Sequence, residues 1–207
     1  MVNIMQQKKM NLRKNKMEKG LSLIEASMVL ALSAIVVSGV MFYYQSASDS
    51  NKTQNTVSQV MSVMSAINGL YVGQASYTGL TDNVLLNSSA VPENYKDKTN
   101  NKINNPFGGK LHVVQNTGAG GGYALLLDGV PKSSCVNIAS MNLGTSLQGV
   151  GVEVNAMKSA GSTVALDATP LTRGSVEKNK VYSGTLTPAN AAALCSGATN
   201  SITFLMK

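Results

Sequence analysis

Residues 21–44 read LSLIEASMVLALSAIVVSGVMFYY, and this stretch decides the fold of the 207-residue chain. It is apolar throughout and has one charged side chain, Glu25. A helix needs about 20 apolar residues to cross a bilayer, so this stretch is long enough to span a membrane. Charged residues make up only 13% of the chain, against about 25% in a typical soluble protein. The composition therefore agrees with a segment that avoids water.

The basic residues of the chain lie mainly before the apolar stretch. Residues 1–20 contain six Lys and Arg side chains against Glu18, a net charge of +5 out of +7 for the whole chain. The positive-inside rule predicts that this end stays in the cytoplasm and that residues after about 45 are exported. Only +2 remains beyond Gly20, and no predicted element carries a basic stripe with interleaved aromatics. A nucleic-acid partner is therefore not expected.

A helical pattern continues beyond the membrane-length stretch. Apolar side chains recur there at spacings of three and four residues: Val57, Val60, Met61, Met64, Ile67 and Tyr71. This is the apolar stripe of an amphipathic helix. A secretory signal peptide would instead have a shorter apolar core followed by a small-x-small cleavage site. We expect one helix over about residues 22–72, roughly 75 Å long, whose second half packs against a globular domain.

Glu25 is unusual in an apolar helix. A carboxylate in the bilayer interior costs about 2.5–3.5 kcal/mol. One interpretation places Glu25 at the level of the lipid head groups, where it is solvated. The other pairs it with a cation, and the nearest candidate is a new N-terminal ammonium created by cleavage before Leu21.

Residues 19–26, KGLSLIEA, resemble the cleavage site of type IV prepilins. The basic leader ending in Gly, the Glu at the fifth position after it and the apolar helix all match that family. The resemblance implies that a dedicated prepilin peptidase cuts after Gly20 and that Leu21 becomes the N-methylated terminus. It also implies that Glu25 neutralises the terminal amine of a neighbouring subunit during assembly.

The long leader and Leu21 as first mature residue resemble the type IVb subclass of enteric bacteria. FYYQSASDSNK (42–52), SAINGLY (65–71) and NPFGGKL (105–111) are similar to bundle-forming and longus-type pilins in particular. The similarity is best in the N-terminal half.

Cys135 and Cys195 are the two cysteines. In an exported domain a single pair of cysteines favours a disulfide. The bond would contribute roughly 4 kcal/mol to folding stability in the chain-entropy model. The alternative is two free, buried thiols.

The C-terminal part has the signals of a mixed domain. Residues 73–109 are rich in Asn, Ser, Thr, Lys and Gly and predict a surface connection with one helical turn near Leu85. Short helices are expected over 135–143, capped by Ser133 or Ser134, and from Thr187 and Pro188 through Cys195. Alternating apolar residues predict strands at 111–114, 123–130, 150–154, 162–166, 181–186 and 202–205.

These elements predict an α+β fold in which a long N-terminal helical spine packs on an antiparallel sheet. The resemblance implies an αβ-roll with one disulfide. We expect a leader over 1–20, the helix over 21–72 with 21–44 as membrane and filament core, and a globular domain over 73–207. Within that domain, 73–109 forms the αβ-loop and 110–207 the sheet and disulfide-bounded region. Residues 135–195 are expected to be exposed on a filament and to make contacts between subunits.

No pattern indicates catalysis, a metal or a cofactor. His112 is the only histidine, and the cysteines form no CxxC motif, which disfavours zinc and redox sites. Gly118–Gly122 predicts a hairpin turn because no Gly-Lys-Ser/Thr follows it. The acids Asp128, Glu153, Asp167 and Glu177 do not cluster, and no GxSxG motif is present.

The residues and the resemblance together predict the major subunit of a type IVb pilus. The resemblance implies that the fibre mediates host-cell adhesion and bacterial aggregation. Its expected partners are other copies of itself, the prepilin peptidase, an assembly ATPase, a platform protein, an outer-membrane secretin and the host-cell surface. The precursor is expected in the inner membrane of a Gram-negative bacterium and the mature form in an extracellular pilus. A type II secretion pseudopilin, a minor pilin and a signal-anchored membrane enzyme are the alternatives.

Overall fold

The computed structural model describes residues 22–89, 91–171 and 176–207. The predicted leader over 1–20, including Gly20, and the expected first mature residue Leu21 lie outside the described residues. The chain divides into two compact units after Tyr44. The two units are described in turn.

The first unit is helical over all its described residues from Leu23 onward. Helix α1, Leu23–Leu70, begins in this unit and has 48 residues. The prediction of a long N-terminal helix is confirmed. Leu, Ala and Met favour a helix, and Gly39 is the weakest helix former within residues 23–44. The helix is long and apolar enough to cross a membrane.

The second unit, residues 45–207, combines the end of α1 with short helices and a sheet. The other helices are α2 Asp82–Leu86, η1 Glu93–Tyr95, α3 Lys132–Ala139, η2 Gly144–Ser146, α4 Asn155–Lys158 and α5 Pro188–Leu194. The strands are β1 Lys96–Asp97, β2 Lys102–Asn104, β3 Lys110–Asn116, β4 Tyr123–Pro131, β5 Leu147–Val152, β6 Thr163–Val164, β7 Ala168–Thr169, β8 Val181–Ser183 and β9 Thr199–Met206.

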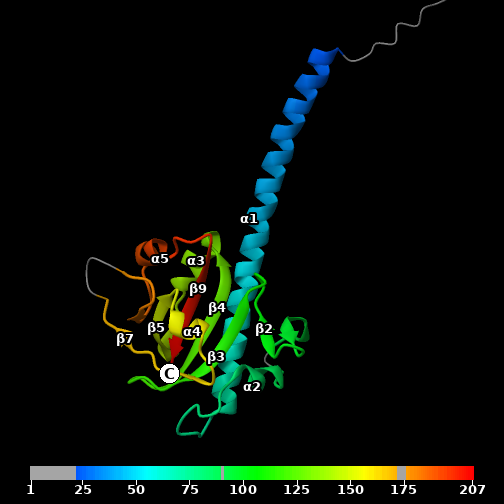
Figure 1. Cartoon of the computed structure of the whole chain (residues 1–207). Helices are drawn as coiled ribbons and strands as arrows, with labels where there is room; N and C mark the ends of the chain where they lie inside the picture. The colour runs from blue at the N-terminus through cyan, green and yellow to red at the C-terminus, as the bar shows by residue number, and fades with distance from the viewer. Residues whose placement is uncertain (1–21, 90, 172–175) are drawn as a thin grey trace, which may run out of the picture. The chain divides into compact units, whose positions relative to one another are not determined.

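The sheet places the last strand of the chain at its centre. Its order is β1-β2-β3-β4-β9-β5-β8-β7, with β6 alongside β3. Figure 1 labels β9 between β4 and β5. Neighbouring strands run antiparallel except for β3 with β6 and β7 with β8. The glycine-rich segment 118–122 connects β3 to β4, which pair antiparallel as its composition predicted. Because β9 has a strand on each side, the C-terminal residues are held by two ladders of hydrogen bonds.

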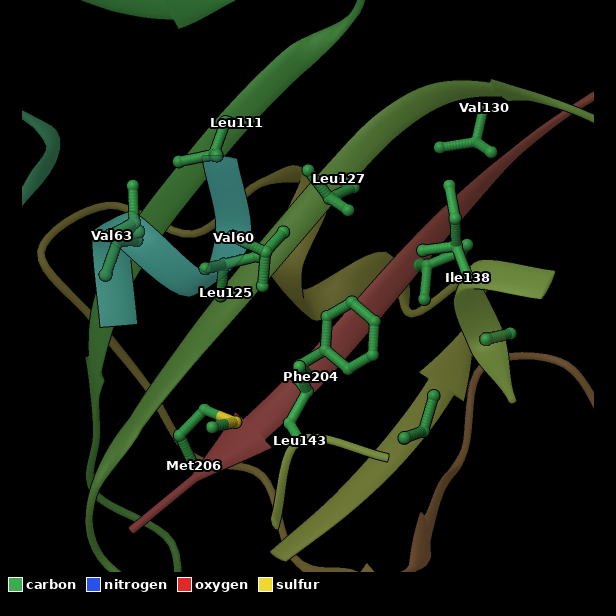
Figure 2. Packing of buried hydrophobic residues seen from close by; sticks show 14 of the residues in the cluster. Val60, Val63, Leu111, Leu125, Leu127, Val130, Ile138, Leu143, Phe204 and Met206 are labelled. Atoms are coloured by element: carbon green, nitrogen blue, oxygen red, sulfur yellow. The ribbon is translucent and has the colours of Figure 1, made fainter. Parts of the chain in front are cut away.

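Alternation along the strands sends apolar side chains to both faces of the sheet. On one face, Val60, Val63 and Ile67 of α1 belong to a core cluster with Leu125 and Phe204. Figure 2 shows Val60 and Val63 beside Leu125, with Phe204 next along the core. Val60 and Ile67 of the predicted apolar stripe are confirmed as core residues, and Met64 and Tyr71 pack against the same cluster. Met61 of that stripe is wrong, because it is 51% exposed, whereas Val63, which the predicted stripe did not include, is fully buried.

A smaller cluster fills the other face of the sheet. It contains Leu126 of β4, Leu205 of β9 and Met157 of α4. Adjacent residues such as Leu125 and Leu126 therefore belong to different clusters, as expected for a strand with both faces buried.

The segment predicted as a surface connection, 73–109, is more ordered than its composition indicated. It contains α2, η1, β1 and β2, and five of its apolar side chains are buried: Leu80, Leu85, Leu86, Val91 and Ile103. The helical turn near Leu85 is confirmed as α2. The prediction missed the strands because each is only two or three residues long and flanked by turn-forming residues.

The two predicted helix caps have different outcomes. Thr187 caps α5, accepting a hydrogen bond from the Asn190 amide at 3.3 Å. The predicted capping of the other helix by Ser133 or Ser134 is wrong, because α3 starts at Lys132 and its N-cap is Pro131. The serines instead bond to residues of α1: Ser133 Oγ donates to Asp49 Oδ2, and Ser134 Oγ accepts from Thr53 Oγ1 at 2.8 Å.

Candidate assembly surfaces

Residues 22–44 expose large apolar side chains on every side of the helix. All of these side chains are exposed except Ala26, which is half-buried. Leu30 is 71% exposed and Phe42 77% exposed. Monomeric soluble proteins rarely expose apolar patches larger than a few hundred Å². This surface therefore needs lipid or other protein around it.

Glu25 lies in the first turn of α1 and is exposed. Its Oε2 accepts a hydrogen bond from the Ser22 amide at 3.0 Å, while the Ser22 carbonyl accepts from the Ala26 amide at 2.9 Å. The amides at a helix start have no partner within the helix, and a carboxylate there also interacts favourably with the helix dipole. A carboxylate has about four acceptor positions, so this one keeps capacity for a further cationic donor.

Cys135 and Cys195 form a disulfide, with their Cα atoms 5.9 Å apart and both residues fully buried. The predicted disulfide is confirmed, which excludes the alternative of two free thiols. Cys135 belongs to α3, and Cys195 is the C-cap of α5. The bond therefore joins two short helices that pack against each other.

His112 has a buried partner that sequence spacing did not reveal. Its Nδ1 lies 2.7 Å from Oδ2 of Asp82, while Oδ1 of Asp82 accepts the Val113 amide at 2.7 Å. Along one edge, β3 pairs with β2 up to Leu111 and with β6 from Gln115 onward. The Val113 amide lies between these two short ladders, and Asp82 accepts its hydrogen bond. The pair holds α2 on the sheet, and its two members are 30 residues apart in sequence.

The ionised side chains of the second unit form small local groups. Hydrogen bonds from the Lys96 and Lys98 ammonium groups lower the pKa of Glu93 to about 2. Burial alone would raise the pKa of Glu153, but hydrogen bonds from Lys158 and from the Ser201 amide hold it below its ordinary value. Among the residues that the structure describes, no three His, Cys, Asp or Glu side chains form a group that could hold a metal ion.

Comparisons with known proteins agree with these features. The family model described as Bundlin matches residues 45–203. The major structural subunits of the bundle-forming pilus from Escherichia coli O111:H- and from E. coli O127:H6 (strain E2348/69 / EPEC) are each 52% identical over 195 residues. Each match covers 93% of this chain and 96% of the relative.

A solved structure extends the comparison to the fold. The type IV b pilin from Salmonella typhi superimposes with a TM-score of 0.50 over 76% of this chain and 99% of that one, at 16% identity. At this identity the likeness concerns the fold alone. The family model and the two E. coli relatives settle the family: the chain belongs to the bundlin family.

Proposed function

We propose that this chain is the major structural subunit of a type IVb pilus. The observation that carries the proposal is the exposed apolar helix over residues 22–44 on a chain whose other unit buries a hydrophobic core of its own. The name of the 52% identical relatives, major structural subunit of bundle-forming pilus, supports it.

The precursor enters the inner membrane through residues 21–44, with its basic leader in the cytoplasm. A prepilin peptidase cuts after Gly20, and Leu21 is N-methylated. Glu25 then accepts the terminal ammonium of a neighbouring subunit. Its exposure and its position in the first turn of α1 support this role, because a charge pair costs less than an isolated carboxylate in an apolar surrounding.

Assembly moves the apolar helix from lipid into protein. A head-to-tail interface that does not close produces a fibre, and residues 22–44 contain the small side chains Ala26, Ser27, Ala31, Ala34 and Gly39, which let helices approach closely. The assembly ATPase, the platform protein and the outer-membrane secretin are its expected partners in assembly and export of the fibre. The polymer then acts outside the cell in adhesion to host cells and in aggregation, as a structural and not a catalytic protein.

Expression in cells with and without the prepilin peptidase tests the proposal. With the full set of assembly genes, shearing should release long fibres whose main component is this chain. Without the peptidase, full-length chain should remain in the inner membrane. Fibres in which the chain is a trace component would indicate a minor pilin. A processed chain that never reaches the surface would indicate a pseudopilin.

A further inference from the structure

Three aromatic residues follow one another where the apolar stretch of α1 ends. Phe42, Tyr43 and Tyr44 stand directly before the polar residues Gln45 and Ser46. The chain has three Phe, seven Tyr and no Trp, and none of the others lies within residues 22–70. The first compact unit also ends at Tyr44. The aromatic rings of the long helix are therefore concentrated at one level, the boundary between its apolar and its polar half.

The three rings point in different directions around the helix. Successive residues of an α-helix are about 100° apart, so Phe42, Tyr43 and Tyr44 cover more than half of its circumference. They are 77%, 77% and 74% exposed, so they do not pack on the rest of the chain. A contact with one neighbouring helix would use residues three or four positions apart on a single face. Consecutive rings form a collar instead, and we call residues 42–44 the aromatic collar.

The collar lies about one bilayer thickness from the charged start of the helix. Glu25 and Tyr43 are 18 positions apart in the sequence, which is about 27 Å along a helix. The hydrocarbon core of a bilayer is about 30 Å thick. The residues between them have no charged side chain and are exposed, except Ala26, which is half-buried. The segment between these two levels thus has the length and the surface that a bilayer requires.

The collar also supplies the anchors that this end of the helix otherwise lacks. The depth of a helix in a bilayer depends on Trp, Tyr, Lys and Arg side chains at the two interfaces. The leader provides basic side chains at one end, but no Lys or Arg occurs over residues 22–51. A tyrosine suits the interface because its ring is apolar and its hydroxyl is polar. The exposed hydroxyls of Tyr43 and Tyr44 can therefore bond to head groups or to interfacial water.

We propose that the aromatic collar anchors the precursor at the outer interface of a phospholipid bilayer. Tyr43 and Tyr44 lie at the level of the lipid head groups on the exported side and stop the apolar helix from sliding. The helix then has a fixed depth, which holds the bond between Gly20 and Leu21 at the cytoplasmic surface for the peptidase. The inference deepens the proposed function and rests on it, because a precursor that is cut at the membrane surface needs a defined depth.

A fluorescence measurement tests the depth of the collar in the full-length precursor. Because the chain has no Trp, Tyr43→Trp introduces a single indole. The precursor is placed in phosphatidylcholine vesicles whose acyl chains carry bromine either next to the head group or next to the terminal methyl. Bromine near the head group should quench the indole of Tyr43→Trp at least about twofold more strongly than bromine near the methyl.

Val36→Trp is the matched control for depth. Val36 is also exposed and lies about 10 Å further into the apolar stretch, so the deep bromine should quench its indole more strongly. Stronger quenching of Tyr43→Trp by the deep bromine would overturn the inference. Equal quenching by the two lipids, or none by either, would also overturn it.

Peptidase cleavage in the same vesicles tests the anchoring. Tyr43→Leu/Tyr44→Leu keeps the segment apolar but removes both interfacial side chains, so cleavage after Gly20 should slow by about threefold or more. The conservative variant Tyr43→Trp/Tyr44→Trp should be cut at the parent rate, because Trp has the same preference for the interface. Val36→Leu/Val37→Leu, which changes two exposed residues outside the collar, should also be cut at the parent rate.

Parent-rate cleavage of the leucine variant would overturn the anchoring role and leave the proposed function standing. Slow cleavage that the tryptophan variant does not restore would overturn it as well, since the tyrosines would then act through a specific contact and not through the interface. A parent chain that the peptidase does not cut at all would contradict the proposed function itself.

Discussion

Leu30 and Leu125 are both leucines, but their exposure to solvent is opposite. Leu30, on the first unit, is 71% exposed, whereas Leu125, in the sheet of the second unit, is fully buried. The second unit covers its apolar residues with its own strands and helices, while the first leaves nearly all of its described side chains uncovered. The stability of the second unit therefore comes from within one chain, and that of the first depends on lipid or on other subunits.

The disulfide gives the largest expected effect, and it should act on the second unit alone. Replacing both Cys135 and Cys195 by Ala opens a loop with a sequence separation of 60. In the chain-entropy model this lowers the free energy of unfolding by about 4 kcal/mol. Urea unfolding of the detergent-solubilised chain, followed by near-UV circular dichroism, measures the loss. Unchanged unfolding would mean that the packing of α3 on α5 suffices without the bond.

A matched pair of leucine truncations tests the contrast between the units directly. Leu125→Ala leaves a cavity and should lower the free energy of unfolding by about 3 kcal/mol. Leu30→Ala removes an exposed side chain and should change it by less than about 0.5 kcal/mol. The same urea titration serves both. Equal losses for the two variants would show that residues 22–44 are covered within the monomer.

Two carboxylates provide a similar pair. Asp82→Ala leaves the buried Val113 amide without its acceptor and His112 without its partner. The free energy of unfolding should therefore fall by about 2 kcal/mol. Glu25→Ala should leave unfolding nearly unchanged because Glu25 is exposed, yet strongly reduce incorporation into fibres. Normal incorporation of Glu25→Ala would contradict the proposed role of this carboxylate.

The smallest expected effect is a pH dependence within the second unit. The pKa of Glu153 is lower in the folded chain than its ordinary value, so its carboxylate stabilises the fold above the unfolded-state pKa. That contribution is lost as the pH falls through the folded-state pKa. Glu153→Gln should therefore lower the free energy of unfolding by about 0.5 kcal/mol at pH 7. Below about pH 4.3, the free energy of unfolding of the variant should fall less steeply with pH than that of the parent. Identical acid unfolding curves for parent and variant would contradict this.

Local patterns in the sequence were enough to predict the long helix, the longer strands and the Thr187 cap. Val60, Met64 and Ile67 repeat at helical spacing, and the signals that place them lie close together in the chain. The disulfide followed from having two cysteines in a chain predicted to be exported.

Features that depend on distant residues were missed. Strands β1, β2 and β7 are too short to show a periodicity, and their pairing is set by longer neighbours such as β3 and β8. The Asp82–His112 contact and the burial of Leu80 depend on how residues 73–109 return to the sheet. The serines expected to cap α3 bond instead to Asp49 and Thr53 of the long helix, a competition that spacing within the α3 segment does not reveal.

Intact-mass and N-terminal analysis of fibres sheared from expressing cells is the decisive measurement for a pilin role. The prediction is one dominant chain that starts at N-methylated Leu21, lacks residues 1–20 and has both cysteines oxidised to the disulfide. Full-length chain confined to the inner membrane, or fibres built from another protein, would contradict the proposal that this chain is processed and polymerised.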